Sequence, residues 1–237
     1  MIEVKNLTKK FNKFTALDDV SVSFNNGQSI ALIGPNGCGK TTLIKCILAL
    51  NVIEKGDILV EGKSVKDHYR YREAIGYMPQ IGRYPENMTI EHTLKMIKDI
   101  RNVPESNLDT ELLEAFELDK LYDKKMGTLS GGTTQKVSAV LAFMFDPKII
   151  ILDEPTACLD PLASEILKSK IIREKNKGKL VIITSHLLSE LDDIVSEIIF
   201  MNEGKILVHQ SVKELLHQTH SGKISESIVQ ILKQMKK

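Results

Sequence analysis

The 237-residue sequence predicts an α/β fold that combines a mainly parallel sheet, a smaller antiparallel β part and an inserted helical part. Short continuous apolar runs, of the kind found in strands buried on both faces, lie at 30–33, 149–152, 180–183 and 198–200. Helical patterns separate several of these runs. Strands that alternate with helices usually form a parallel sheet with helices on both of its faces.

The first third of the chain predicts the antiparallel part. Alternating apolar and polar residues at 2–4 and 20–24 are typical of strands with one buried face. Asn26-Gly27 is a strong hairpin signal, and Glu61-Gly62 is a second one. A helix from about Lys40 to Leu50 is expected to follow the apolar run at 30–33.

The inserted helical part is predicted at 85–145, where apolar residues recur at helical spacing, as in Leu108, Leu112, Leu113 and Phe116. Another helix should begin after Asp160, a favoured N-cap residue, with Pro161 at the first helical position. We therefore divide one domain into an α/β core with its β subdomain (1–84 and 146–210), a helical subdomain (85–145) and a C-terminal helical tail (211–237).

The composition excludes several classes of protein. Lys and Arg number 32 against 31 Asp and Glu, so no excess of positive charge indicates nucleic-acid binding. Aromatic residues make up 5% and Trp is absent, which argues against a base-stacking platform. No apolar run approaches membrane-spanning length, and the first residues do not resemble a signal peptide. The three cysteines form no CxxC pair, so we expect reduced thiols and a cytoplasmic location.

A glycine-rich segment follows the run at 30–33. Its sequence, Gly34-Pro35-Asn36-Gly37-Cys38-Gly39-Lys40-Thr41, fits the pattern G-x-x-x-x-G-K-[ST]. In that pattern the glycines let backbone N–H groups point at phosphate oxygens, the lysine reaches the β- and γ-phosphates, and the hydroxyl binds Mg²⁺. We predict a nucleoside triphosphate site at 34–42, which includes Thr42. A turn without a ligand is the weaker alternative, and the loop alone does not separate kinases, GTPases and motors.

Polar residues end several of the predicted strands. Asp153 and Glu154 directly follow an apolar run, at the sheet edge where α/β proteins bind ligands. Asp153 is expected to hold Mg²⁺, and Glu154 to orient or deprotonate the attacking water. His186 ends another run and is expected to contact the γ-phosphate, although a lone histidine is more often structural. Gln80 is expected to sense Mg²⁺ or water where the helical part begins.

A second anion site is suggested by Leu129-Ser130-Gly131-Gly132-Thr133-Thr134-Gln135-Lys136. Ser130 can cap the helix that starts here, and Gly131-Gly132 expose backbone N–H groups at its positive end. An ordinary capped helix would carry the same residues, and physical reasoning from the sequence does not decide between the two.

Taken together and in this order, the motifs resemble those of the ATP-binding cassette (ABC) ATPases over nearly the whole chain. The resemblance implies a RecA-like P-loop core, ATP and Mg²⁺ as cofactors, and a head-to-tail homodimer that traps ATP. Phe11 would stack on adenine, and Ser130, Gly131 and Gly132 would bind the γ-phosphate of the partner's nucleotide. The chain departs from the common pattern at Phe11, Thr133, Lys136 and Cys158, but none of these changes removes a metal ligand or the base.

Within this family, a single cassette without a membrane span usually docks on a separate membrane protein, on the inner face of the cell membrane. The groove near Gln80 to Glu91 would receive that partner's coupling helix. Residues 77–87 and 140–147 are similar to the NosF subfamily, which serves copper-centre maturation of nitrous oxide reductase. The alternative is a soluble ABC protein of translation or DNA repair. Those proteins usually carry two cassettes or a coiled-coil insertion, and neither is evident here.

Overall fold

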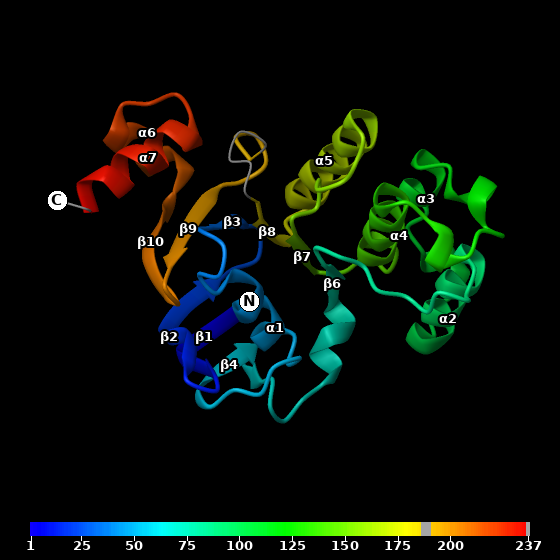
Figure 1. Cartoon of the computed structure of the whole chain (residues 1–237), viewed down its shortest axis with the longest axis horizontal. Coiled ribbons are helices and arrows are strands. Elements are labelled where there is room, and N and C mark those ends of the chain that lie inside the picture. Colours follow the sequence, from blue (N-terminus) through cyan, green and yellow to red (C-terminus); the bar gives the residue numbers. More distant parts are fainter. Residues whose placement is uncertain (186–190, 236–237) are drawn as a thin grey trace. The chain divides into compact units, whose positions relative to one another are not determined.

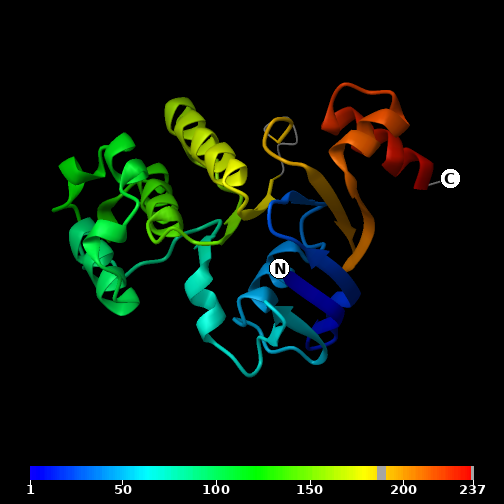
Figure 2. The ribbon, with the colours of Figure 1, turned by 180° about the vertical axis from the view of Figure 1, so that it is seen from behind.

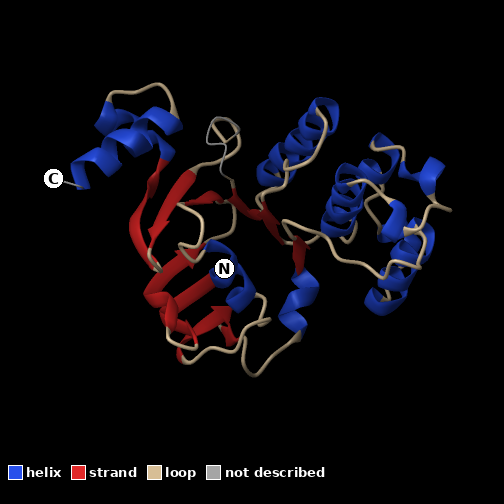
Figure 3. Ribbon diagram, viewed as in Figure 1, coloured by secondary structure: helices blue, strands red, loops and turns tan. Residues whose placement is uncertain are grey.

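The computed structural model describes residues 1–185 and 191–235, which form two compact units. Unit 1 contains Met1–Tyr71 and Leu180–Lys237, and unit 2 contains Arg72–Lys179. Figures 1 and 2 show the chain from opposite sides, coloured along the sequence. Strands dominate unit 1 and helices dominate unit 2 (Figure 3).

The first sheet of unit 1 is antiparallel throughout. Strand β1 (Ile2–Phe11) lies between β2 (Phe14–Phe24) and β4 (Lys55–Val60), and the short β5 (Lys63–Ser64) pairs with β4. Phe11 faces Phe14 across the β1–β2 turn, which is formed by Asn12 and Lys13. The turn predicted at Glu61-Gly62 is confirmed, because it joins the paired residues Val60 and Lys63.

The hairpin predicted at Asn26-Gly27 is wrong. This segment does turn, with Gly27 at a φ of 79°, but β2 and the next strand belong to different sheets. Strand β3 (Ser29–Ile33) pairs instead with β8 (Leu180–Thr184) and β9 (Glu197–Asn202), both in parallel. A local turn signal reports that the chain reverses, but the pairing partner is chosen by burial of β3, whose five residues are all buried.

The remaining elements of unit 1 are one further strand and its helices. Strand β10 (Lys205–Ser211) is antiparallel to β9. Helix α1 spans Lys40–Ile47 and is shorter than predicted, because Leu48 already leaves the helix and Ala49 has a φ of 51°. The tail is helical as expected: α6 (Val212–Thr219) begins with a capping box at Ser211, and α7 (Ile224–Met235) follows.

Unit 2 combines two parallel strands, β6 (Ile75–Met78) and β7 (Ile149–Asp153), with four α-helices. These helices are α2 (Ile90–Arg101), α3 (Glu111–Ala115), α4 (Gly131–Phe143) and α5 (Pro161–Asn176). Short 3-10 turns lie at Glu105–Asn107, Leu118–Leu121 and Met126–Thr128, and a further one, Arg70–Ala74, begins in the last residues of the first segment of unit 1. Helix α4 packs so closely on β6 that a Cβ at Gly76 would lie 1.9 Å from the carbonyl oxygen of Ala142.

A buried ionic cluster fixes α5 to the segment before α3. Lys170 is 2% exposed at its side chain and pairs with Asp109, with Glu111 at 2.9 Å and with Glu174 at 3.2 Å. Glu174, 1% exposed, also pairs with Lys177 at 2.8 Å and with Lys179. Burial by itself would raise the pKa of Glu174, but the surrounding lysines outweigh it and lower that pKa to about 2. Glu174 is therefore a carboxylate held ionised in the interior.

Candidate active site

The phosphate loop of unit 1 is built between two buried elements, β3 and α1. Its first and last glycines have no room for a side chain. A Cβ at Gly34 would lie 2.1 Å from the Met201 carbonyl oxygen, and one at Gly39 would lie 2.6 Å from the Ala16 oxygen. Both residues also have positive φ values, 148° and 111°. Pro35, Asn36 and Gly37 are exposed between them, so the tip of the loop is open to a ligand while its base is fixed.

Lys40 begins α1 and folds back over this loop. Its Nζ donates to the carbonyl oxygens of Gly34 at 2.8 Å and Pro35 at 3.2 Å, and it lies 3.8 Å from Sγ of the buried Cys38. Thr41 and Thr42 follow in the first turn of the helix and are partly exposed. One cation and the positive end of a helix thus meet at the loop, which is an arrangement suited to phosphate.

Phe11 lies at the turn that leads into β2, whose next residues are fixed beside this loop. It is 46% exposed and ends β1, opposite the start of β2. The Gly204 carbonyl accepts from Asp18 N at 2.9 Å, and Gly204 N donates to the Cys38 carbonyl at 3.0 Å. These bonds, together with the Ala16–Gly39 contact, fix the first residues of β2 beside the loop. The turn that carries Phe11 is therefore attached to the phosphate loop.

The predicted carboxylates lie where β7 ends in unit 2. Asp153 is 2% exposed, and Glu154 follows with a φ of 53°, a strained value for a residue with a side chain. Gln80 comes two residues after the neighbouring β6, and its Nε2 donates to Glu154 Oε2 at 3.0 Å. The structure thus brings Gln80 and Glu154 into direct contact. Sequence reasoning missed Tyr77 on β6, whose pKa rises to about 12 through burial and the charge of Asp153.

The second glycine motif begins α4 as predicted. Ser130 Oγ accepts from Thr133 N at 3.2 Å and lies 2.9 Å from Thr133 Oγ1. Gly132 packs on the turn before α5, where an added Cβ would lie 2.7 Å from the Cys158 carbonyl oxygen. This contact requires glycine for a reason of packing, independent of any ligand.

Sequence reasoning also missed a link between this motif and Asp160. Lys136 Nζ lies 2.9 Å from Asp160 Oδ2, while Asp160 Oδ1 accepts from Ala163 N at 2.8 Å as the predicted N-cap. The backbone hydrogen bond and the Lys136 interaction lower the pKa of Asp160. No spacing in the sequence signals this pair, because its members lie 24 positions apart on different helices.

The predicted site residues divide between the units. Phe11 and residues 34–42 belong to unit 1, whereas Gln80, Ser130, Gly131, Gly132, Asp153 and Glu154 belong to unit 2. His186 lies outside the described residues.

A family model described as ABC transporter matches residues 17–157, more than half of the chain. The chain belongs to the ABC transporter family. Over 219 residues it is 32% identical to the uncharacterized ABC transporter ATP-binding protein YhaQ of Bacillus subtilis, covering 91% of this chain and 72% of YhaQ. It is 30% identical over 230 residues to the lipopolysaccharide export system ATP-binding protein LptB of Escherichia coli, covering 94% and 95%.

A solved structure of an ATP-binding subunit of an ABC transporter has the same fold. It matches with a TM-score of 0.90 at 28% identity and covers 98% of this chain and 99% of the other. The fold class predicted from the sequence is therefore confirmed. The protein is an ATP-binding cassette of an ABC transporter and an ATPase.

Proposed function

We propose that this ABC cassette hydrolyses ATP as a head-to-tail homodimer and drives a separate integral-membrane subunit, docked on the inner face of the cell membrane. The observation that carries the proposal is that the sequence holds all the predicted hydrolytic residues, together with an exposed serine, Ser130, in the second glycine motif, which corresponds to the family's signature motif. Ser130 caps α4 with its hydroxyl at the surface. A nucleotide bound to the phosphate loop of one copy would meet this serine on the other.

In unit 1, the nucleotide is held by Phe11 and residues 34–42. Phe11 stacks on adenine, Lys40 contacts the β- and γ-phosphates, and the loop backbone from Gly34 to Gly39 surrounds the phosphate chain. The close contacts of Gly34 and Gly39 support this assignment, because they hold the loop in one conformation before a ligand arrives.

Mg²⁺ is assigned to Thr41, Gln80 and Asp153. Among the described residues, no three His, Cys, Asp or Glu side chains cluster around a possible metal. Mg²⁺ does not need such a cage, because it keeps several waters and binds one or two protein oxygens plus substrate phosphates. The donors present fit this preference: the hydroxyl of Thr41, the buried carboxylate of Asp153, and the amide oxygen of Gln80, whose nitrogen donates to Glu154. When bound, the ion supplies charge neutralisation at the β- and γ-phosphates.

Glu154 is assigned as the base that orients and deprotonates the attacking water. The Gln80 amide donates to Glu154 Oε2, which helps to fix this carboxylate just after β7, in a position to act on the water. His186 is assigned to the γ-phosphate from its motif alone.

A mixing experiment tests the head-to-tail arrangement. Lys40→Ala damages the phosphate loop, and Ser130→Arg damages the signature, so each homodimer has two damaged sites. A mixed dimer has one site in which both partners contribute intact residues. We expect each variant to be inactive alone and the mixture to regain ATPase activity with a second-order dependence on protein concentration. A mixture as inactive as its components, or full activity in a dilute monomer, would refute the dimer.

The membrane subunit is assigned to a groove in unit 2. A cavity of about 470 Å³ is lined by Gly82, Arg83, Tyr84, Glu86, Met126, Gly127 and Thr134. It overlaps the predicted docking segment from Gln80 to Glu91, and Gln80 connects that segment to Glu154. Within the described part of the chain, no helix has the length and apolarity needed to cross a bilayer. Co-purification with a multi-span membrane protein supports docking, whereas co-sedimentation with ribosomes would favour the translation alternative.

Two finer assignments complete the proposal. We propose a helical subdomain at 85–145, between the two parts of the core in the sequence, and a helical tail from 211.

A NosF-like role in copper-centre maturation rests on two short segments, and neither YhaQ nor LptB is described as serving that process. Neighbouring genes for a periplasmic copper-maturation protein would support that role.

A further inference from the structure

An unexpected cation lies beneath the exposed aromatic ring of unit 1. Lys9 Nζ is 4.8 Å from the centroid of the Phe11 ring. The residue is only 7% exposed, although Lys5 and Lys10 on the same strand are exposed. A β-bulge near Asn6 shifts the alternation of β1, so that Leu7 and Lys9 both face inward. The sequence pattern alone does not reveal this burial.

The ammonium group has a dedicated carboxylate. Lys9 Nζ donates to Glu54 Oε1 at 2.6 Å, and Glu54 Oε2 accepts from the backbone N–H of Lys10 at 3.2 Å. The hydrogen bond from Lys9 lowers the pKa of Glu54, so this carboxyl is ionised at neutral pH. Both oxygens of Glu54 are therefore fixed on β1, and the lysine is held in one position.

The same cluster acts electrostatically on helix α1, which follows the phosphate loop. Burial raises the pKa of the Cys46 thiol in α1 to about 11, with smaller opposing effects from Lys9 and Glu54. Lys9 thus lies over one face of the Phe11 ring, its inner face, and acts electrostatically on helix α1. Lys9 is itself buried whereas Phe11 is 46% exposed, so we expect a base to reach the ring on its outer face, the face away from Lys9.

We propose that Lys9 is a positioning residue for the nucleobase, held in place by Glu54. It fixes the Phe11 ring through a cation–π contact and draws π-electron density toward its inner face. The outer face is then less repulsive to the π system of a stacked base, and the ring does not have to be ordered when nucleotide binds. This inference rests on the proposed role of Phe11 in stacking on adenine.

Two other roles for Lys9 predict different behaviour. A lysine that only attracts phosphate charge would affect every polyphosphate equally. A purely structural ion pair would change stability and leave the preference for base-containing ligands unaltered. The ratio between ATP affinity and inorganic tripolyphosphate affinity therefore separates these roles, because tripolyphosphate has the phosphates and lacks the base.

The experiment measures calorimetric binding of ATP and of tripolyphosphate to the full chain. Lys9→Met should weaken ATP binding about threefold to tenfold, the range of a cation–π contact, and leave tripolyphosphate binding within about twofold. Lys9→Arg should retain most of the ATP affinity, because guanidinium also stacks on aromatic rings. Lys10→Met is the matched control on the opposite face of the strand and should change neither ligand.

Glu54→Gln provides a second variant if Lys9→Met folds poorly, and it should shift the ratio in the same direction because Lys9 loses its anchor. Equal weakening of both ligands, or an unchanged ratio in Lys9→Met and Glu54→Gln, would overturn the proposal. Phe11→Ala separates the two levels of inference. If Phe11→Ala lowers the ratio of ATP affinity to tripolyphosphate affinity while the Lys9 variants keep the wild-type ratio, only the role of Lys9 fails. If Phe11→Ala leaves the ratio unchanged, the adenine assignment of Phe11 fails, and the role of Lys9 fails with it.

Discussion

The buried carboxylate of Glu174 allows a quantitative prediction about the stability of unit 2. Replacing it by Gln keeps the shape of the side chain and removes the charge that Lys170, Lys177 and Lys179 surround. Its pKa falls from the ordinary 4.5 to about 2. At about 1.4 kcal/mol for each tenfold change in an acid constant, this difference corresponds to about 3 kcal/mol of folding free energy. We therefore expect Glu174→Gln to lose about that much stability at pH 7.

The pH dependence follows from the direction of the shift. A carboxyl whose pKa is lowered on folding stabilises the protein fully above its unfolded pKa, near 4.5, and loses this effect as the pH falls toward 2. The gap between wild type and Glu174→Gln should therefore be constant from pH 7 to about pH 5 and shrink by roughly half at pH 3.

Urea unfolding followed by circular dichroism at several pH values measures this gap. Glu165→Gln is the matched control on the same helix, since Glu165 is 70% exposed and pairs with Lys168 at 3.1 Å. A surface pair of this kind contributes about 0.5 kcal/mol or less. The reasoning is refuted if Glu174→Gln is as stable as Glu165→Gln at pH 7, or if the gap does not shrink in acid.

Three further predictions concern the site. Glu154→Gln should bind ATP normally but lower phosphate release by about 10²- to 10⁴-fold, the usual contribution of a general base; a wild-type rate would remove that role. Gly34→Ala should lose ATP binding and melt at a lower temperature, because its Cβ would lie 2.1 Å from the Met201 oxygen; normal binding would show that the loop tolerates a side chain. Lys136→Met should change stability little, since its partner Asp160 is exposed, yet reduce turnover, whereas Lys136→Arg should retain it; equal ATPase rates in the two variants would leave the Lys136–Asp160 pair without a role.

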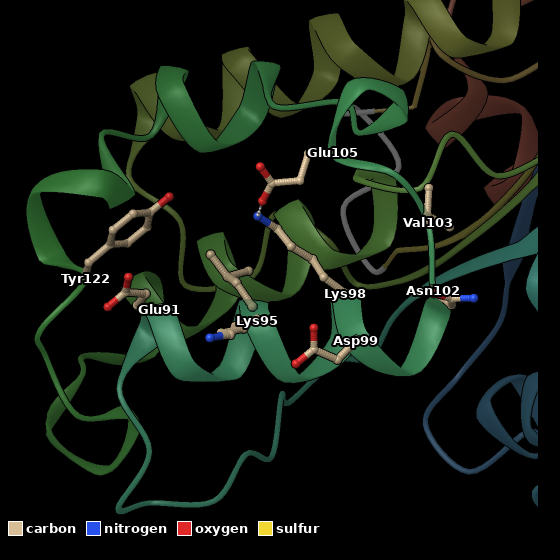
Figure 4. Close-up of a pocket in the computed structure, with 9 residues that line it drawn as sticks. Glu91, Lys95, Lys98, Asp99, Asn102, Val103, Glu105 and Tyr122 are labelled. Carbon is tan, nitrogen blue, oxygen red and sulfur yellow. Dashed lines mark hydrogen bonds and ion pairs between the residues drawn. The ribbon is translucent and has the colours of Figure 1, made fainter.

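One cavity on the helical side of unit 2 holds none of the predicted site residues. It has a volume of about 530 Å³ and lies along α2, with Lys95, Lys98 and Asp99 on the helix and Tyr122 opposite (Figure 4). Lys98 points toward Glu105 and pairs with it at 3.5 Å. Its lining carries charges of both signs and includes Glu91, the last residue of the predicted docking segment, but it shares no residue with the groove assigned to the membrane subunit.

The motifs could be read directly from the sequence because each is a short, contiguous stretch. The pattern from Gly34 to Thr41 specifies the loop, and Ser130 and Asp160 cap their helices as predicted. These features depend on backbone conformation over a few neighbouring residues, which local residue types determine. The buried strands were predictable for a related reason, since an unbroken apolar run such as 149–152 fits only the interior.

Tertiary structure decided which distant residues meet. Asn26-Gly27 indicated a turn correctly, but the pairing of β3 with β8 and β9 made it a link between sheets. Lys9 is buried because a bulge shifts the register of β1 by one residue, and no alternation pattern records where such a shift occurs. The Gln80–Glu154 and Lys136–Asp160 contacts likewise depend on how strands and helices pack. The sequence by itself determined the chemistry available to this ATPase, whereas packing set which groups support one another, because contacts between remote residues depend on the register and packing of the whole fold.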